Sequence, residues 1–300
     1  MHYNKLIDLV GNTPILKWND LFLKLETFNP SGSIKDRPAS FMLERLIKNG
    51  IIKQGDTIIC PTSGNMGISL AYFSKHFKLN VIIVMPDNMS LERRNIIKSL
   101  GANLILTPSA SGISGSIKKA KELSTLYGYY YFDQFDNMLN AVSHFKTLQE
   151  IVKDIPDTDY IVCGIGTGGT YIGLKLMAKH LNLNTKIIGI EPSNSGLISK
   201  CINQEPILLD NNKNGVPGLN SDSISNIIVK NINEVDNIYL VNPQEVYDFF
   251  LENVKRGLFI GISAAANLLI ANKIKKENPK KKIVVIIPDG IDRYYSDLSE

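Results

Sequence analysis

The sequence has few cysteines, little excess charge and no long apolar run, and each of these absences excludes a class of protein. Its three cysteines, at positions 60, 163 and 201, are widely spaced and odd in number, so they form no CxxC metal motif and no disulfide framework. A net charge of +4 is too small and too dispersed to indicate a nucleic-acid-binding chain. The longest apolar runs, 81–85 and 283–287, fall far short of the roughly 18 residues of a membrane span. We therefore expect no metal, no nucleic acid and no membrane as partners.

Length and composition predict an ordinary globular chain. The 300 residues suggest about two domains of roughly 150 residues each, and 44% hydrophobic and 21% charged residues are typical of such domains. The first 14 residues lack the basic start, apolar stretch and small-residue site of a signal peptide. Together with the unpaired cysteines, this predicts a cytoplasmic protein.

Short β-rich runs alternate with longer amphipathic ones along the chain. The predicted strands span 21–26, 57–60, 81–85, 103–106, 129–132, 160–164, 186–191, 238–241 and 282–287. The predicted helices span 34–49, 67–77, 91–100, 114–127, 139–153, 170–181, 243–256 and 263–276. This alternation predicts the α/β class, with right-handed βαβ units and mostly parallel sheets. In such sheets ligands bind beyond the carboxyl ends of the strands, so the strand-to-helix loops are the places to search for a site.

Two of these loops combine glycine with small polar residues. The segment 60–67, CPTSGNMG, offers hydroxyl and amide donors at a helix start, which suits a carboxylate, although the same residue types also make a simple cap and turn. The segment 164–170, GIGTGGT, leaves backbone amides free to hold a phosphate. It also satisfies G-x-G-x-x-G, with Glu191 at the end of the next strand, so a nicotinamide-dependent oxidoreductase is an alternative on this motif.

Two further helix starts carry a residue with reactive or hydrogen-bonding potential. In 30–37, PSGSIKDR, we expect Ser33 to cap a helix and Lys35 to lie in its first turn, where the helix dipole disfavours a protonated amine. A neutral amine is what a Schiff base requires, while a surface lysine paired with Asp36 is the simpler interpretation. Ser263 in GISAAA is either a helix cap or a hydroxyl that meets a ligand.

Taken together, these loops resemble the cysteine synthase family, the β-replacement branch of the fold-type II enzymes that use pyridoxal 5'-phosphate (PLP). The resemblance runs nearly end to end, from VGNTP at 10–14 through NPSGSIKDR, PTSGNMG, MPDNMSLERR and GIGTGGT to Pro288-Asp289. It implies a tryptophan synthase β-like fold with two α/β domains, each a mostly parallel twisted sheet flanked by helices. We expect a smaller domain over 1–145, with about 12–32 able to cross over, and a larger one over 146–300. The family also implies a homodimer.

The resemblance implies a role for each matching residue. Lys35 would hold PLP as a Schiff base and then act as the base at the substrate Cα. Asn65 and Ser263 would contact the cofactor ring. The residues implied to bind its phosphate are Gly166, Thr167, Gly168, Gly169 and Thr170. The residues implied to line the substrate carboxylate site are Thr62, Ser63, Asn65, Met66 and Gln134.

Three departures from the family pattern bear on the reaction. Met66 stands where the family usually has threonine, and Ala264 and Ala265 replace the usual Ser-Gly. Asp222 places a carboxylate in the cleft-facing loop where the family generally has a small neutral residue; turn capping is its simpler explanation.

The departure at Asp222 favours a particular reaction within the family. We predict a lyase or transferase of cysteine metabolism that acts on L-cysteine and releases H2S through an aminoacrylate. Water would then give L-serine, or a second thiol would give lanthionine, with Asp222 as the candidate catalytic base. The alternative is an O-acetylserine sulfhydrylase, a cysteine synthase of amino-acid biosynthesis that makes cysteine and acetate. A non-catalytic binding module of the same family is a further alternative.

Overall fold

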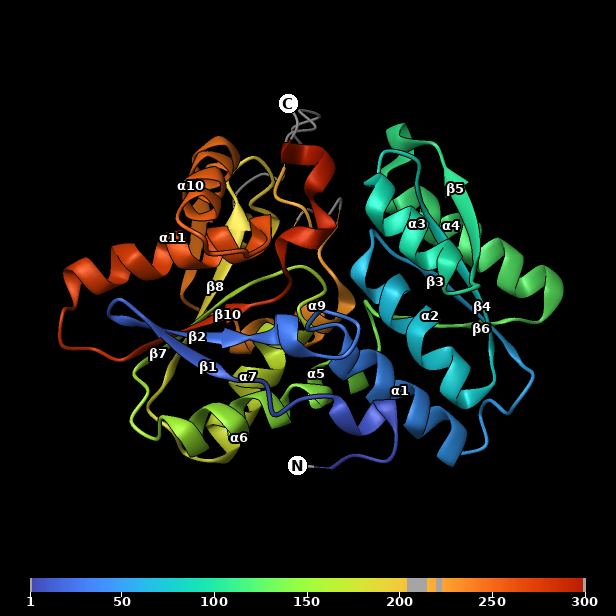
Figure 1. Ribbon diagram of the computed structural model, residues 1–300, viewed down its shortest axis with the longest axis horizontal. Helices are drawn as coiled ribbons and strands as arrows, with labels where there is room; N and C mark the ends of the chain where they lie inside the picture. Colours follow the sequence, from blue (N-terminus) through green and yellow to red (C-terminus); the bar gives the residue numbers. More distant parts are fainter. Residues whose placement is uncertain (1, 204–214, 220–222, 299–300) are drawn as a thin grey trace. The chain divides into compact units, whose positions relative to one another are not determined.

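The computed structural model describes residues 2–203, 215–219 and 223–298 (Figure 1). Contacts along the chain define two compact units. Unit 1 comprises Met1–Val10, Asn29–Gln134 and Asp292–Glu300, and unit 2 comprises Gly11–Phe28 and Phe135–Ile291. Each unit holds a mainly parallel sheet flanked by helices, so the predicted α/β fold class is confirmed. The predicted domain boundary at 145/146 remains a prediction, because the units are defined by contacts within the chain and are not a test of separate domains.

Unit 1 contains a four-stranded sheet in the order β5-β4-β3-β6, with every neighbouring pair parallel. The strands are β3 (Thr57–Pro61), β4 (Asn80–Pro86), β5 (Asn103–Thr107) and β6 (Tyr130–Tyr131). The helices are α1 (Asp36–Lys48), α2 (Asn65–Phe77), α3 (Leu91–Ser99) and α4 (Gly112–Tyr127). Strand β4 is buried from its second residue onward, which explains its continuous apolar sequence. Ala120 of α4 packs on Ile59, Ile82 and Val84 of the sheet.

Unit 2 contains a six-stranded sheet in the order β1-β2-β10-β7-β8-β9, in which only β1 is antiparallel to its neighbour. Its strands are β1 (Ile15–Trp18), β2 (Leu21–Leu25), β7 (Tyr160–Gly164), β8 (Lys186–Pro192), β9 (Ile238–Val241) and β10 (Ile283–Ile287). Its helices are α5 (Leu139–Ser143), α6 (Phe145–Asp154), α7 (Gly169–His180), α8 (Leu197–Ile202), α9 (Asn226–Lys230), α10 (Pro243–Lys255) and α11 (Ile262–Glu277). The five residues of β10 are fully buried, as its inner position in the sheet requires.

The structure differs from the predicted elements of unit 2 in several places, among them the short helices α8 and α9, which were not predicted. Strand β1 has no counterpart in the prediction; it is an edge strand with exposed central residues, and a turn containing Asn19 at φ 51° joins it to β2. The helix predicted over 139–153 is two helices that meet at His144. The His144 N–H donates to Ala141 O, a tighter bond than an α-helix makes, and this breaks the helical run.

Within the part of the chain that the structure describes, no helix combines the length and apolar character needed to cross a membrane.

Candidate active site

The loop before α1 in unit 1 carries the predicted reactive lysine. Lys35 is the N-cap residue immediately before α1, which begins two residues later than the predicted helix, and its side chain is partly buried. Its N–H donates to Ser33 Oγ at 3.3 Å, so Ser33 shapes the turn without being the N-cap itself. The amine is therefore carried at the positive end of a 13-residue helix.

Asp36 stabilises the loop that carries Lys35 through hydrogen bonds to Ser31. It is fully buried and accepts hydrogen bonds from Ser31 N at 2.6 Å and from the Ser31 hydroxyl. The Ser31 hydroxyl also lies 3.2 Å from Ser69 Oγ of α2, and the Arg293 guanidinium donates to Ser31 O. Burial raises the pKa of Asp36 to about 6, against the lowering effect of the Ser31 and Ser69 hydrogen bonds. The simpler interpretation of Lys35, as a surface lysine paired with Asp36, does not explain these buried contacts of Asp36.

The raised pKa of Asp36 predicts a pH dependence of stability. Between about pH 4, its ordinary pKa, and pH 6 the folded state binds the proton more tightly than the unfolded state, so stability falls as the pH rises through this window. The loss amounts to about 2–3 kcal/mol. In Asp36→Asn this loss should disappear, which urea unfolding midpoints at pH 4 and pH 7 would measure. Asp154→Asn, an exposed aspartate, is the control and should keep the wild-type difference. Equal pH dependence in wild type and Asp36→Asn would contradict the prediction.

The second site loop of unit 1 joins β3 to α2 and holds most of the predicted carboxylate-binding residues. Thr62 is buried, and its Oγ1 accepts the Gly64 N–H at 3.1 Å, which closes the turn. Ser63 is exposed at the tip of the loop. Asn65 and Met66 begin α2, and Met66 is buried. The first turn of α2 contains no acidic residue and its N-cap is a glycine, so its backbone N–H groups remain suited to an anion.

Gln134, the last residue of the unit 1 segment Asn29–Gln134, contacts this loop. Its side chain is buried and its Nε2 donates to Pro61 O at 3.0 Å, across 73 positions of sequence. The structure thus brings together the predicted carboxylate-binding residues of unit 1, as the parallel pairing of β3 with β6 requires. With the Ser31–Ser69 contact, the lysine loop and α2 are also neighbours.

In unit 2 the glycine-rich loop lies between β7 and α7, and its glycines leave no room for side chains. A Cβ at Gly166 would lie 2.3 Å from Gly218 O, and one at Gly169 would lie 2.0 Å from Asn140 Oδ1. Gly168 has φ 83°, which favours glycine, and is also closely packed. Backbone N–H groups at the start of a 12-residue helix form the cradle that a phosphate group fits.

Two residues that the sequence prediction did not include support the threonines of this loop. Asn140 Nδ2 donates to Thr167 Oγ1 at 3.1 Å, and His144 Nε2 lies 3.3 Å from Thr170 Oγ1. Both supporting residues are fully buried and lie four positions apart on α5 and its end. Their four-residue spacing predicts that both side chains lie on one face of the predicted helix, but this spacing does not indicate which loop they contact.

The close packing of Gly166 predicts an effect on cofactor retention. In Gly166→Ala the new methyl group meets backbone that cannot rotate away, so the loop must shift. We expect the affinity for PLP to fall about tenfold or more, measured by dialysis and absorbance. Gly257→Ala is the control for general destabilisation: its φ of 81° strains alanine, but nothing lies within 4 Å of the added Cβ, so it should leave PLP affinity unchanged. Undiminished PLP affinity in Gly166→Ala would contradict the role of this loop.

Ser263 lies in the first turn of α11 and is buried. Asn267, one turn further on, donates from Nδ2 to Ile286 O at 2.8 Å, and its Oδ1 lies 3.3 Å from where a Gly164 Cβ would be. The start of α11 is thus held beside the strand that leads into the glycine-rich loop. Ala264 and Ala265, which together replace the family's usual Ser-Gly, are fully buried.

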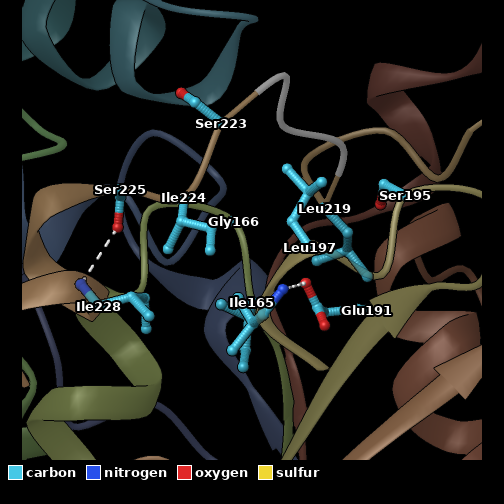
Figure 2. A pocket seen from close by; sticks show the side chains of 11 residues that line it. Ile165, Gly166, Glu191, Ser195, Leu197, Leu219, Ser223, Ile224, Ser225 and Ile228 are labelled. Atoms are coloured by element: carbon cyan, nitrogen blue, oxygen red, sulfur yellow. Dashed lines mark hydrogen bonds between the residues drawn. The ribbon is translucent and has the colours of Figure 1, made fainter. Parts of the chain in front are cut away.

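A pocket of unit 2 lies beside the glycine-rich loop (Figure 2). Residues from four segments line it: Ile165, Gly166, Glu191, Ser195, Leu197, Ile198, Leu219, Ser223, Ile224, Ser225 and Ile228. Glu191 accepts from Ile198 N at 2.9 Å and from Ser199 N and Oγ at 3.0 Å, so its carboxylate is engaged by the start of α8. A dinucleotide site would need this acid for a ribose, and the geometry therefore does not support the oxidoreductase alternative. Asp222, the proposed base, lies outside the described residues.

Comparison with known proteins shows the class to which this site belongs. Residues 6–289 match the family of pyridoxal-phosphate dependent enzymes, and the chain belongs to that family. It is an enzyme of the family's cysteine synthase group, and PLP is its cofactor. The cradle of unit 2 fits the phosphate of that cofactor, and the resemblance predicted from the motifs is confirmed.

Three similar proteins illustrate the reactions within the group. Cysteine synthase B of Campylobacter jejuni is 36% identical, over 98% of this chain and 97% of its own. A hydrogen sulfide-producing enzyme of Fusobacterium nucleatum is 33% identical with a TM-score of 0.86, over 98% of this chain and 100% of its own. The third structure is an aspartate-to-asparagine mutant of a hydrogen sulfide-producing enzyme, solved with an α-aminoacrylate intermediate. It is 32% identical with a TM-score of 0.86, over 97% of this chain and 90% of its own.

Proposed function

We propose that this enzyme degrades L-cysteine, releasing H2S and forming L-serine with water or lanthionine with a second cysteine. The observation that carries this proposal is Asp222, an acidic residue that lies in the sequence between Leu219 and Ser223, two residues that line the unit 2 pocket. Two similar structures are described as hydrogen sulfide-producing enzymes, and one of them was solved as an aspartate-to-asparagine mutant. These likenesses support the proposal for this chain.

Asp222 discriminates between nucleophiles by its charge and basicity. Water is a poor nucleophile at neutral pH and needs a base to remove its proton. Sulfide is already largely ionised and would be repelled by a carboxylate. An aspartate beside the substrate Cβ therefore favours addition of water or a neutral thiol over addition of sulfide.

We assign the remaining roles as follows. When bound, PLP draws electrons from the substrate Cα. Lys35 holds the cofactor and removes the Cα proton; the Cβ–S bond then breaks and the sulfur leaves as HS⁻, which takes a proton to become H2S. The new nucleophile bonds to Cβ, its proton passes to Asp222, and Cα regains a proton from Lys35. Asp222 then releases its proton to solvent, which balances the solvent proton that HS⁻ takes up.

The binding residues orient the substrate and the cofactor during these steps. The β3–α2 loop with Gln134 holds the α-carboxylate, and Asn65 contacts the oxygen on the cofactor ring. The loop 166–170 holds the phosphate, with Asn140 and His144 supporting its threonines. Ser263 faces the ring nitrogen, where a hydroxyl does not favour protonation as a carboxylate would. The weaker electron withdrawal that results favours elimination from Cβ.

O-acetylserine sulfhydrylase activity is the second candidate function. A similar protein at 36% identity is named cysteine synthase B, which supports that reaction directly. In this case Asp222 would cap a turn and play no chemical part.

Product analysis with purified enzyme separates the two reactions. We expect L-cysteine alone to yield H2S with L-serine or lanthionine, faster than O-acetylserine and sulfide yield cysteine. Incubation in H2¹⁸O distinguishes water from thiol addition, because only the L-serine hydroxyl would carry the label. Cysteine formation from O-acetylserine far faster than H2S release would overturn the proposal in favour of the second function.

We also infer a cytoplasmic homodimer. Cys60 and Cys163 are buried free thiols, and Cys201 is an exposed free thiol, which suits a reducing compartment. Sedimentation equilibrium of the purified protein tests the dimer, and a mass of one chain would contradict it.

A further inference from the structure

Arg93 is a buried cation for which the structure provides little compensation. It lies in the first turns of α3, within the motif MPDNMSLERR, and only 7% of its surface is exposed. Across the described part of unit 1, no hydrogen bond or ion pair involves its side chain, and its Nε is buried. Its guanidinium carbon lies 4.7 Å from the centre of the Tyr294 ring, which is its one electrostatic contact among those residues. A buried charge is costly without a partner, and a ring face compensates only part of that cost.

The Arg93 side chain lies directly against the loop that holds the predicted carboxylate site. A Cβ at Gly64 would lie 2.4 Å from Arg93 Cδ and 2.8 Å from Arg93 Nε, so only glycine allows this approach. Gly64 is the N-cap of α2, the 13-residue helix whose first turn has no acidic residue. The positive end of the α2 dipole and the Arg93 cation therefore act on the same part of the loop, around Gly64.

We propose that Arg93 is a positioning residue for substrate recognition, whose charge favours the α-carboxylate of the amino acid at the β3–α2 loop. It acts through the loop, by packing under Gly64 and by the field of its guanidinium, without a direct contact to the substrate. This proposal rests on the assignment of the loop as the carboxylate site, and it is independent of the leaving group and of the nucleophile.

Tyr294 has a supporting part in this arrangement. Its ring is 1% exposed and lies in the C-terminal segment of unit 1. That segment is anchored to the start of α3 by Ser296, whose N–H and Oγ donate to Glu92 at 2.9 Å. The C-terminal segment thus holds the arginine in place against Gly64, although the Ser296–Glu92 contact spans 204 positions of sequence.

A matched pair of ligands isolates the effect of the Arg93 charge. L-alanine has no leaving group on Cβ, so its equilibrium binding to the holoenzyme can be followed by cofactor absorbance without turnover. Ethylamine is the same molecule without the carboxylate. In Arg93→Met, which keeps the stem but removes the charge, we expect the Kd of L-alanine to rise about tenfold and that of ethylamine to stay within about twofold. Arg93→Lys, which keeps the charge, should raise the L-alanine Kd no more than about threefold.

Two further variants complete the experiment. Lys98→Met removes an equal charge from an exposed position of the same helix and should leave both Kd values unchanged. Tyr294→Leu should weaken the binding of L-alanine but not of ethylamine. Tyr294→Phe retains the ring and should match wild type for both ligands. This pair also tests the proposal if Arg93→Met does not fold. An unchanged L-alanine Kd in Arg93→Met, or equal weakening of both ligands, would overturn the proposal. Because no H2S or cysteine is measured, failure of the proposed reaction leaves this result interpretable.

Discussion

Replacement of Lys35 by alanine is expected to abolish turnover, with a loss of roughly 10³-fold or more. The variant loses both the amine that holds the cofactor and the base that removes the Cα proton. Its fold should be retained, because Ser31 and Asp36 hold the start of α1 through their own hydrogen bonds. Purified Lys35→Ala should therefore give a normal circular dichroism spectrum with greatly reduced H2S release from L-cysteine.

Borohydride reduction gives this prediction a chemical readout. Treatment of the wild-type holoenzyme should fix the cofactor covalently to Lys35, which peptide mapping identifies. Lys48→Ala, an exposed lysine at the end of the same helix, is the control and should keep wild-type labelling and activity. A label on another lysine in the wild-type enzyme would show that the assignment of Lys35 is incorrect.

Replacement of Asp222 by asparagine is expected to separate the two halves of the reaction. Elimination should proceed, because Lys35 is intact, and L-cysteine should give a burst of about one H2S per active site. The later addition of water loses its base, so steady-state L-serine formation should fall about 10²–10⁴-fold. Rapid-quench measurement of H2S, followed by steady-state product analysis, records both phases.

The same variant distinguishes a base from a structural residue by its response to the nucleophile. Sulfide needs no base and is repelled by a carboxylate, so Asp222→Asn should form cysteine from O-acetylserine and sulfide at least as fast as wild type. Ser223→Ala, in the same loop, is the control and should match wild type in both reactions. Wild-type L-serine formation in Asp222→Asn would show that Asp222 is a turn residue.

Much of the site can be predicted from the sequence because its loops are local. Gly166 and Lys35 occur next to the elements that position them, a strand followed by a helix in one case and a helix start in the other. The backbone N–H groups that form the cradle belong to the same few residues that carry the glycines. The continuous apolar runs of β4 and β10 likewise indicate strands buried on both faces.

The partners of these loops could not be predicted, since they depend on strand order. Gln134 meets Pro61 because β6 pairs with β3, and Asn140 meets Thr167 because α5 packs against α7. Neither pair has a local signal, since the partners are 73 and 27 positions apart. Hydrogen-bonding side chains at such separations have many possible partners until the sheet is formed.

The amino-acid sequence by itself therefore determined the fold class, the cofactor and the loops that we propose hold it, through motifs in which chemistry and backbone conformation coincide. Only the tertiary structure decided how these loops are supported. It placed Arg293 on Ser31, 262 positions away, and Arg93 between Gly64 and Tyr294. The physical reason is that burial of a charged side chain depends on packing from distant segments, so neither the buried Arg93 cation nor the raised pKa of Asp36 is encoded in any local pattern.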